Sequence, residues 1–119
     1  MMFEIAFVGT CKAPIGRNFA GPVEPQFPVG TAFPLEVGKR LVLGRAKDCA
    51  ILVDSMIAQR HHIAVTLGSD EVLLVENLGG GSHVYSAGKY VDDRVKLAAG
   101  GKFELGGVLI FEFRPAPTP

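Results

Sequence analysis

The sequence predicts an all-β fold, an antiparallel sandwich of short strands. Runs rich in Val, Leu, Ile and Phe alternate apolar with polar residues and recur at spacings of about ten residues, between turns that contain glycine. No apolar spacing typical of an amphipathic helix competes with this alternation. All eight prolines lie outside residues 35–114, so no proline removes a hydrogen-bond donor from a central strand there. The three observations together favour a sandwich.

Nine segments have the alternation expected of strands. The second of them contains Pro34, which cannot donate a backbone hydrogen bond and therefore belongs at a sheet edge or a strand end. In the last, Phe111 and Phe113 fall on one face and are expected in the core. In chain order the segments are residues 3–8, 31–35, 40–43, 51–53, 62–67, 71–76, 94–97, 102–105 and 108–113.

Two regions lie outside this regular pattern. Residues 11–30 form a Pro/Gly-rich loop, and a loop of that length in a compact domain is either functional or poorly ordered. Thr10, at its start, is a candidate intramolecular ligand if phosphorylated. Residues 115–119 are rich in proline and are expected to be a tail or a linker stub. We therefore expect one domain, residues 1–114.

Size and composition narrow the function classes. The chain has 119 residues, enough for one core but not for two. Its 12 basic and 12 acidic residues balance, which argues against nucleic acid as a partner and against recruitment to anionic lipid.

Cys11 and Cys49 fit neither a disulfide scaffold nor a zinc-site spacing, so free thiols are expected. No apolar run approaches the roughly 20 residues that span a bilayer, and the start lacks the features of a secretory signal. A cytoplasmic location without membrane insertion is therefore expected.

The stretch from Gly44 to Val65 carries most of the functional information. It places an arginine, a tight turn, a short strand and a basic-polar loop in succession. A guanidinium group can hold a phosphate through paired, charge-assisted hydrogen bonds. This order of residues suits the binding of a phosphorylated peptide.

The chain resembles the forkhead-associated (FHA) domains, which are β-sandwiches that bind phosphothreonine peptides through the loops at one end. Residues 38–45 match the family's glycine followed by a strand that ends in Gly-Arg, and residues 30–35 match the strand before it. A second block follows the family's pattern of Asp-Cys-x-Ile-x-Leu-x, an acidic residue and Ser-Arg-x-His, with Asp48, Cys49, Ile51, Leu52, Asp54, Arg60 and His62. The resemblance continues through Asn77-Leu78-Gly79 to the closing strands, and it implies a sandwich of about eleven short strands.

The resemblance implies a set of site residues. Arg45 is expected to bind the phosphate, with Gln59, Arg60, Gly81 and Ser82 lining the peptide site. Lys47, His61 and His83 are possible auxiliary residues, whereas Gly44 and His62 are expected to be structural. Arg45 has an alternative role as a structural residue that bonds loop carbonyl groups.

Two positions depart from the family's pattern. Gln59 replaces the phosphate-binding serine, and its longer stem is expected to weaken that contact by about 1 kcal/mol. The Thr-Asn-Gly loop reads Gly81-Ser82-His83, and serine is too short to span a peptide backbone as an asparagine amide does. We therefore expect phosphothreonine binding that is weak or altered in specificity, or docking that does not depend on phosphorylation.

Alternation identifies the family's structural histidine. If it is His62, then Ile63, Val65 and Leu67 share the buried face of the next strand, whereas His61 would place Ala64 and Thr66 there. The first arrangement buries more apolar area, so we assign His62 and expect it to be buried and hydrogen-bonded.

Metal binding and catalysis have little support in the sequence. His61 and His62 are adjacent, so on a strand they point to opposite faces, and no cysteine or carboxylate lies at ligand spacing from them. The chain has no nucleophile elbow, phosphate-binding loop or paired-carboxylate signature. We expect no cofactor, no metal and no enzymatic activity, and a phosphorylated protein or peptide as the partner.

Overall fold

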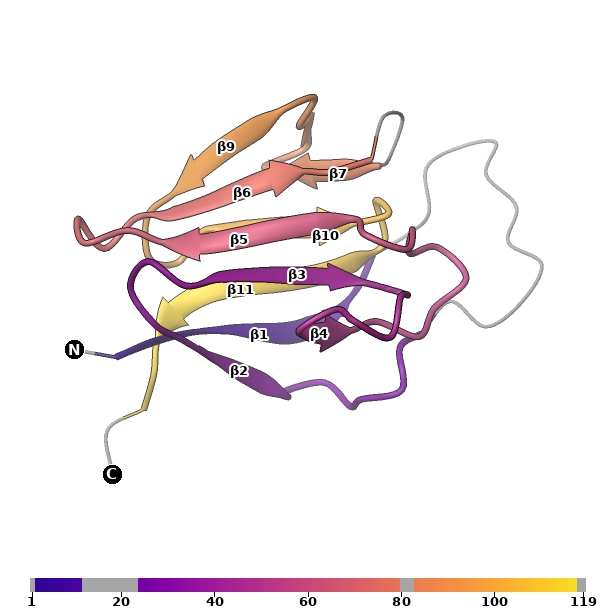
Figure 1. The fold of residues 1–119 in the computed structure, drawn as a ribbon, viewed down its shortest axis with the longest axis horizontal. Helices are drawn as coiled ribbons and strands as arrows, with labels where there is room; N and C mark the ends of the chain where they lie inside the picture. The colour runs from indigo at the N-terminus through magenta and orange to yellow at the C-terminus, as the bar shows by residue number, and fades with distance from the viewer. Residues whose placement is uncertain (1, 12–23, 80–82, 118–119) are drawn as a thin grey trace.

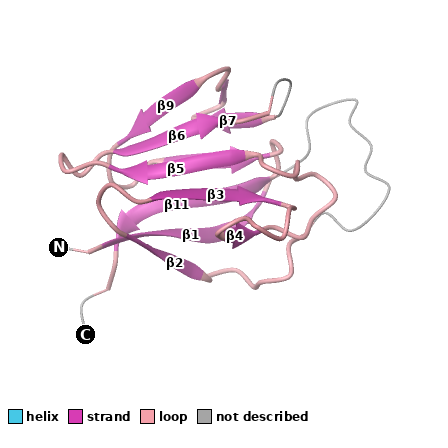
Figure 2. Cartoon of the chain, in the orientation of Figure 1, coloured by secondary structure: helices cyan, strands magenta, loops and turns pink. Residues whose placement is uncertain are grey.

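The structure is a computed structural model that describes residues 2–11, 24–79 and 83–117. Within these residues the fold is all-β, as predicted, with eleven strands and no helix (Figures 1 and 2). No described residue therefore belongs to a helix long and apolar enough to cross a membrane. The strands are β1 (Phe3–Thr10), β2 (Ala32–Leu35), β3 (Arg40–Gly44), β4 (Ile51–Leu52), β5 (Ile63–Leu67), β6 (Leu73–Asn77), β7 (Val84–Ser86), β8 (Lys89–Tyr90), β9 (Arg94–Leu97), β10 (Lys102–Leu105) and β11 (Leu109–Pro115).

The strands form two packed sheets. One sheet has the order β2-β1-β11-β10-β7-β8, and the other has the order β4-β3-β5-β6-β9. Figure 1 shows the second sheet in front of the first, with the strands of both running roughly along the long axis of the view. Every strand pair is antiparallel except β3 and β4, which pair in parallel at Leu43 and Ile51. The predicted antiparallel sandwich is thus confirmed, with one short parallel pair added.

The strand predictions agree with the structure to within two residues at each end. Pro34 lies on β2, an edge strand that pairs only with β1, as its missing donor requires. Strands β7 and β8 were not predicted, because their positions are set by pairing with β10 and with each other and not by an alternating pattern of their own.

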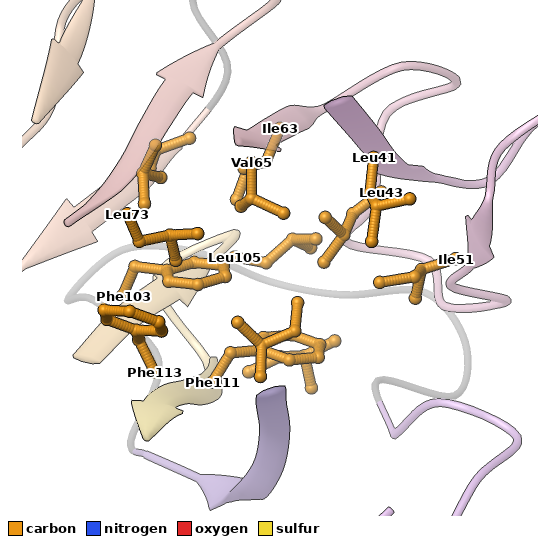
Figure 3. Close-up of a cluster of buried hydrophobic side chains, with 14 of the residues drawn as sticks. Leu41, Leu43, Ile51, Ile63, Val65, Leu73, Phe103, Leu105, Phe111 and Phe113 are labelled. Carbon is orange, nitrogen blue, oxygen red and sulfur yellow. The ribbon is translucent and has the colours of Figure 1, made fainter. Parts of the chain in front are cut away.

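The core lies between the two sheets, and both contribute fully buried side chains (Figure 3). Phe103 and Phe111 of one sheet stack with ring centroids 5.4 Å apart. Ile63 and Val65 of β5 face them from the other sheet, which confirms the register inferred from alternation. Each fully buried side chain of this kind contributes roughly 1.5–3 kcal/mol to folding. This core holds the strand ends, and with them the loops, in place.

The part of the Pro/Gly-rich loop after residue 23 packs against the sandwich. The ring of Phe27 meets those of Phe7 and Phe33 with centroid separations of 5.5 and 5.3 Å. The side-chain amide of Gln26 donates to the carbonyl oxygen of Leu52 and accepts from the backbone N–H of Asp54. Strand β4 is an edge strand, and the Gln26 amide forms the hydrogen bonds that a neighbouring strand would otherwise form with it.

The end of the domain departs slightly from the expected boundary at residue 114. Strand β11 continues to Pro115, which lies opposite Phe3, and the backbone N–H of Ala116 donates to the carbonyl oxygen of Met2. The first two residues of the expected tail are therefore tied to the sheet.

Candidate functional site

Loops from both sheets meet at one end of the sandwich. Strands β3, β6 and β10 all end there, on the right in Figure 1, and β5, β7 and β11 begin there. The loops that concern the site are residues 45–50 between β3 and β4, residues 53–62 between β4 and β5, and residues 78–83 between β6 and β7. The opposite end carries the start of β1 and the end of β11 (Figure 1).

Gly44 lets the first two loops approach each other. A β-carbon at this position would overlap the carbonyl oxygen of Arg60 and lie 2.9 Å from that of Gln59. The space is used for backbone hydrogen bonds, because the N–H groups of Arg45 and Ala46 donate to the carbonyl oxygens of Gln59 and Arg60 at 2.8 and 3.0 Å. The glycine before the arginine is therefore a packing requirement, and it fixes where the backbone of Arg45 lies.

His62 joins the second loop to the third. Its side chain is only 1 % exposed, and Nδ1 accepts the backbone N–H of Gln59 at 2.9 Å. Because Nδ1 accepts, the hydrogen lies on Nε2, which is 3.0 Å from the carbonyl oxygen of His83 and donates to it. The backbone carbonyl of His62 also accepts from Leu78. One neutral imidazole thus holds residues 59 and 83 in a fixed relation.

Four of the side chains that the sequence assigned to the ligand are open to solvent. Arg45, Lys47, Gln59 and Arg60 are all exposed. Within residues 2–11, 24–79 and 83–117, none of the four forms a side-chain hydrogen bond or ion pair. The backbones of Arg45, Gln59 and Arg60 are held by hydrogen bonds between the loops, while all four side chains are open to solvent. This arrangement suits the capture of an anion from solution.

His61 occupies a different environment from its neighbours. Its Nε2 lies 3.0 Å from Oδ1 and 3.1 Å from Oδ2 of Asp48, in the adjacent loop. The hydrogen bond from His61 lowers the pKa of the Asp48 carboxyl below its usual value, and the charge of Arg60 adds a little to this effect. The Asp48 carboxylate therefore offsets part of the positive charge expected here.

The third loop is only partly described. Gly81 and Ser82 lie outside the described residues, so their predicted contacts with a peptide remain predictions. The carbonyl oxygen of His83 accepts from the N–H of Gly106, which ties this loop to the turn between β10 and β11. The ring of His83 lies parallel to that of Tyr85, with centroids 6.4 Å apart.

One group of possible ligand residues was missed by the sequence reasoning. Asp48, Cys49 and His61 offer donor atoms that all lie within 4.8 Å of one another. The sequence showed no cysteine or carboxylate at ligand spacing from these histidines, because Cys49 and His61 are 12 positions apart. The structure nevertheless brings Asp48 and Cys49 close to His61. Only the pairing of the two loops reveals it.

Comparisons with known proteins agree with the fold. The family model described as FHA domain matches residues 41–106. A search of curated protein sequences found no significant match to the chain.

Several solved structures share the architecture. The FHA domain of the CT664 protein from Chlamydia trachomatis superposes with a TM-score of 0.73 at 22% identity, covering 98% of this chain and 100% of that one. Mycobacterium tuberculosis EmbR in complex with a low-affinity phosphopeptide gives 0.68 at 18% identity, covering 99% and 26%. The cytoplasmic domain of the type III secretion sorting platform protein PscD from P. aeruginosa gives 0.68 at 13% identity, covering 100% and 84%. At these identities the likeness shows the fold alone.

Proposed function

The chain belongs to the FHA domain family, and on this basis we propose that it is a protein-interaction module that binds a phosphothreonine-containing segment of a partner. Domains of this family are interaction modules and not enzymes. In this proposal Arg45 holds the phosphate, and Gln59, Arg60, Gly81 and Ser82 line the peptide site. Lys47, His61 and His83 surround it.

One observation carries the proposal, the exposed Arg45 side chain on a fixed backbone. Its N–H is bonded to the carbonyl oxygen of Gln59 at 2.8 Å, while its guanidinium has no protein partner among the described residues. Binding a phosphate therefore requires no existing ion pair to be broken. Hydrogen bonds between charged groups of this kind are worth roughly 1.5–3 kcal/mol.

In this proposal Gln59 lowers the affinity for the phosphate. Its side chain is exposed and can still donate from its amide, but its longer stem loses more rotamer freedom than serine when it contacts a ligand. We propose that this substitution weakens phosphate binding, and that the changed third loop alters what is recognised beyond the phosphate.

The proposal is tested with two peptide libraries that differ only in a fixed phosphothreonine or threonine. We expect the chain to retain the phosphorylated library preferentially. Arg45→Gln should weaken that binding by roughly 10- to 100-fold, the factor that corresponds to 1.5–3 kcal/mol. Arg40→Gln is the matched control, because Arg40 is an exposed arginine at the opposite end of the same strand.

Restoring the family's serine provides a second, independent test. Gln59→Ser should raise the affinity for the phosphorylated library several-fold, or about 1 kcal/mol.

Equal retention of both libraries, unaffected by Arg45→Gln, would instead support docking that is independent of phosphorylation. The departures at Gln59 and in the Gly81-Ser82-His83 loop are the observations that favour this second function.

A further inference from the structure

Asp48, Cys49 and His61 form a cluster of three different metal-ligating groups beside the proposed phosphate site. The Nε2 of His61 lies 3.0 Å from the nearer carboxylate oxygen of Asp48, and one donor atom from each of the three residues lies within 4.8 Å of the other two. Asp48 and His61 are exposed, whereas Cys49 is only 9 % exposed. The cluster is therefore open to solvent on one side and anchored in the protein on the other.

Backbone contacts set the position of the cluster. Asp48 and Cys49 belong to the loop of residues 45–50, and His61 belongs to the loop of residues 53–62. The carbonyl oxygen of Arg60 joins the two, because it accepts the N–H of Ala46 at 3.0 Å and the thiol of Cys49 at 3.1 Å. These backbone contacts hold the two loops together, and the Asp48 carboxylate already lies against His61 Nε2.

We propose that Asp48, Cys49 and His61 bind a zinc ion that links the two loops. Carboxylate, thiolate and imidazole are the three protein ligands of Zn²⁺, and tetrahedral zinc at about 2.0–2.3 Å from each ligand places neighbouring donors roughly 3.3–3.8 Å apart. The donors of Asp48 and His61, 3.0 Å apart, lie slightly closer than this range, and all three donors lie within 4.8 Å of one another. The exposed side chains of Asp48 and His61 can rotate to meet the range. The fourth position faces solvent and would hold a water molecule.

Binding of the ion releases a proton from the protein. The Cys49 thiol gives up its proton, which also ends its hydrogen bond to the carbonyl oxygen of Arg60. Neutral His61 donates its Nε2 proton to the hydrogen bond with Asp48, so this proton must move to Nδ1 before Nε2 can bind the ion, and the hydrogen bond is then replaced by two bonds to the ion. With His61 initially neutral, one proton is released for each ion bound, and the local charge rises by one unit.

Cobalt(II) titration of the reduced, tag-free chain tests the site without any peptide. We expect one ion per chain, a near-ultraviolet charge-transfer band from a cobalt–thiolate bond, visible bands of a tetrahedral ion, and displacement of cobalt by zinc. Cys49→Ser should remove the thiolate band. Asp48→Asn and His61→Gln, both at exposed positions, should each weaken binding at least about tenfold, as loss of one ligand does.

Matched controls separate this site from other thiols and histidines. Cys11→Ser removes the second thiol, which donates to the carbonyl oxygen of Gly107, and His83→Gln removes a histidine of the neighbouring loop. Both variants should bind cobalt like the original chain. If Cys49→Ser fails to fold, the two exposed variants still decide the matter, because they leave the core unchanged.

The pH dependence adds a further criterion. Burial, and to a lesser extent the Asp48 carboxylate, raises the pKa of the Cys49 thiol. Metal affinity should therefore increase as the pH rises through neutrality, because the thiol proton is displaced more easily. Absence of the thiolate band, a band that survives Cys49→Ser, or binding unchanged in both Asp48→Asn and His61→Gln would show that His61 and Asp48 form only an ion pair, and would overturn the proposal.

Discussion

Two arginines at different places in the sandwich illustrate how the fold pairs one charge and leaves another exposed. Arg114, on β11, lies directly opposite Glu4 of β1, and its Nε donates to that carboxylate at 2.8 Å. Glu112 lies 3.6 Å from the same guanidinium, and the bond to Glu4 raises the pKa of Arg114 further above its ordinary value. Arg45 has no such partner within the described residues.

The difference arises from where each backbone lies. Arg114 lies within the β1–β11 strand pair, one residue before the end of β11, where the residue opposite is fixed by register and can be an acid. Arg45 follows the last residue of β3, and its neighbours in space are backbone carbonyl groups that its own N–H satisfies. The charge on the paired strand has a partner across the sheet, whereas the charge in the loop beyond β3 stays exposed.

Substitution of Gly44 should have the largest effect, because it breaks the framework that holds Arg45. Gly44→Ala forces the β-carbon against the backbone of Gln59 and Arg60, which no side-chain rotation can relieve. We expect a loss of about 3 kcal/mol in the free energy of unfolding, measured by urea denaturation. Gly100→Ala is the control, since its β-carbon meets nothing and only its φ of +94° is unfavourable, at a cost of about 1 kcal/mol. Equal losses in the two variants would contradict the role given to Gly44.

Removing each arginine in turn should give opposite results. Arg114→Met leaves the carboxylate of Glu4, only 7 % exposed, without its charged partner and should lower the free energy of unfolding by about 2 kcal/mol. Arg45→Met should change it by less than about 0.5 kcal/mol. Urea denaturation gives the stability of both variants, and the phosphorylated peptide library gives their binding. If Arg114→Met were as stable as the original chain, or if Arg45→Met were destabilised, the ion pair of Arg114 would not be the arginine contact that supports the fold.

The smallest effect concerns Asp48, whose carboxylate has a partner, as the Arg114 guanidinium does, but is exposed, as the Arg45 guanidinium is. Its pKa is lowered chiefly by the hydrogen bond from His61, so the ionised form favours the folded state. This contribution is present above the ordinary aspartate value of 3.8 and is lost as the pH falls through the lowered value in the folded protein. Titration of the carboxyl by NMR, with a chelator present, should show a return toward the ordinary pKa in His61→Gln. An unchanged titration would mean that the pair does not form in solution.

The sequence predicted most of the fold because local patterns determine it. The alternation of apolar residues identified nine strands, and the same alternation distinguished His62 from His61 by the side chains that follow each. Strands β7 and β8 were not identified from the sequence, since their register is set by pairing with β10 and with each other and not by their own composition. The parallel pairing of β4 with β3 likewise depends on the path of a loop.

By itself, the sequence determined that this chain is a β-sandwich with an arginine at a strand end, because period-two alternation and a Gly-Arg step are properties of neighbouring residues. Only the tertiary structure decided that Arg114 is paired with Glu4 while Arg45 stays exposed, and that Asp48 and Cys49 lie close to His61. These are contacts between loops and strands far apart in the chain. Sheet register and loop packing fix them, and no spacing within a single segment encodes either.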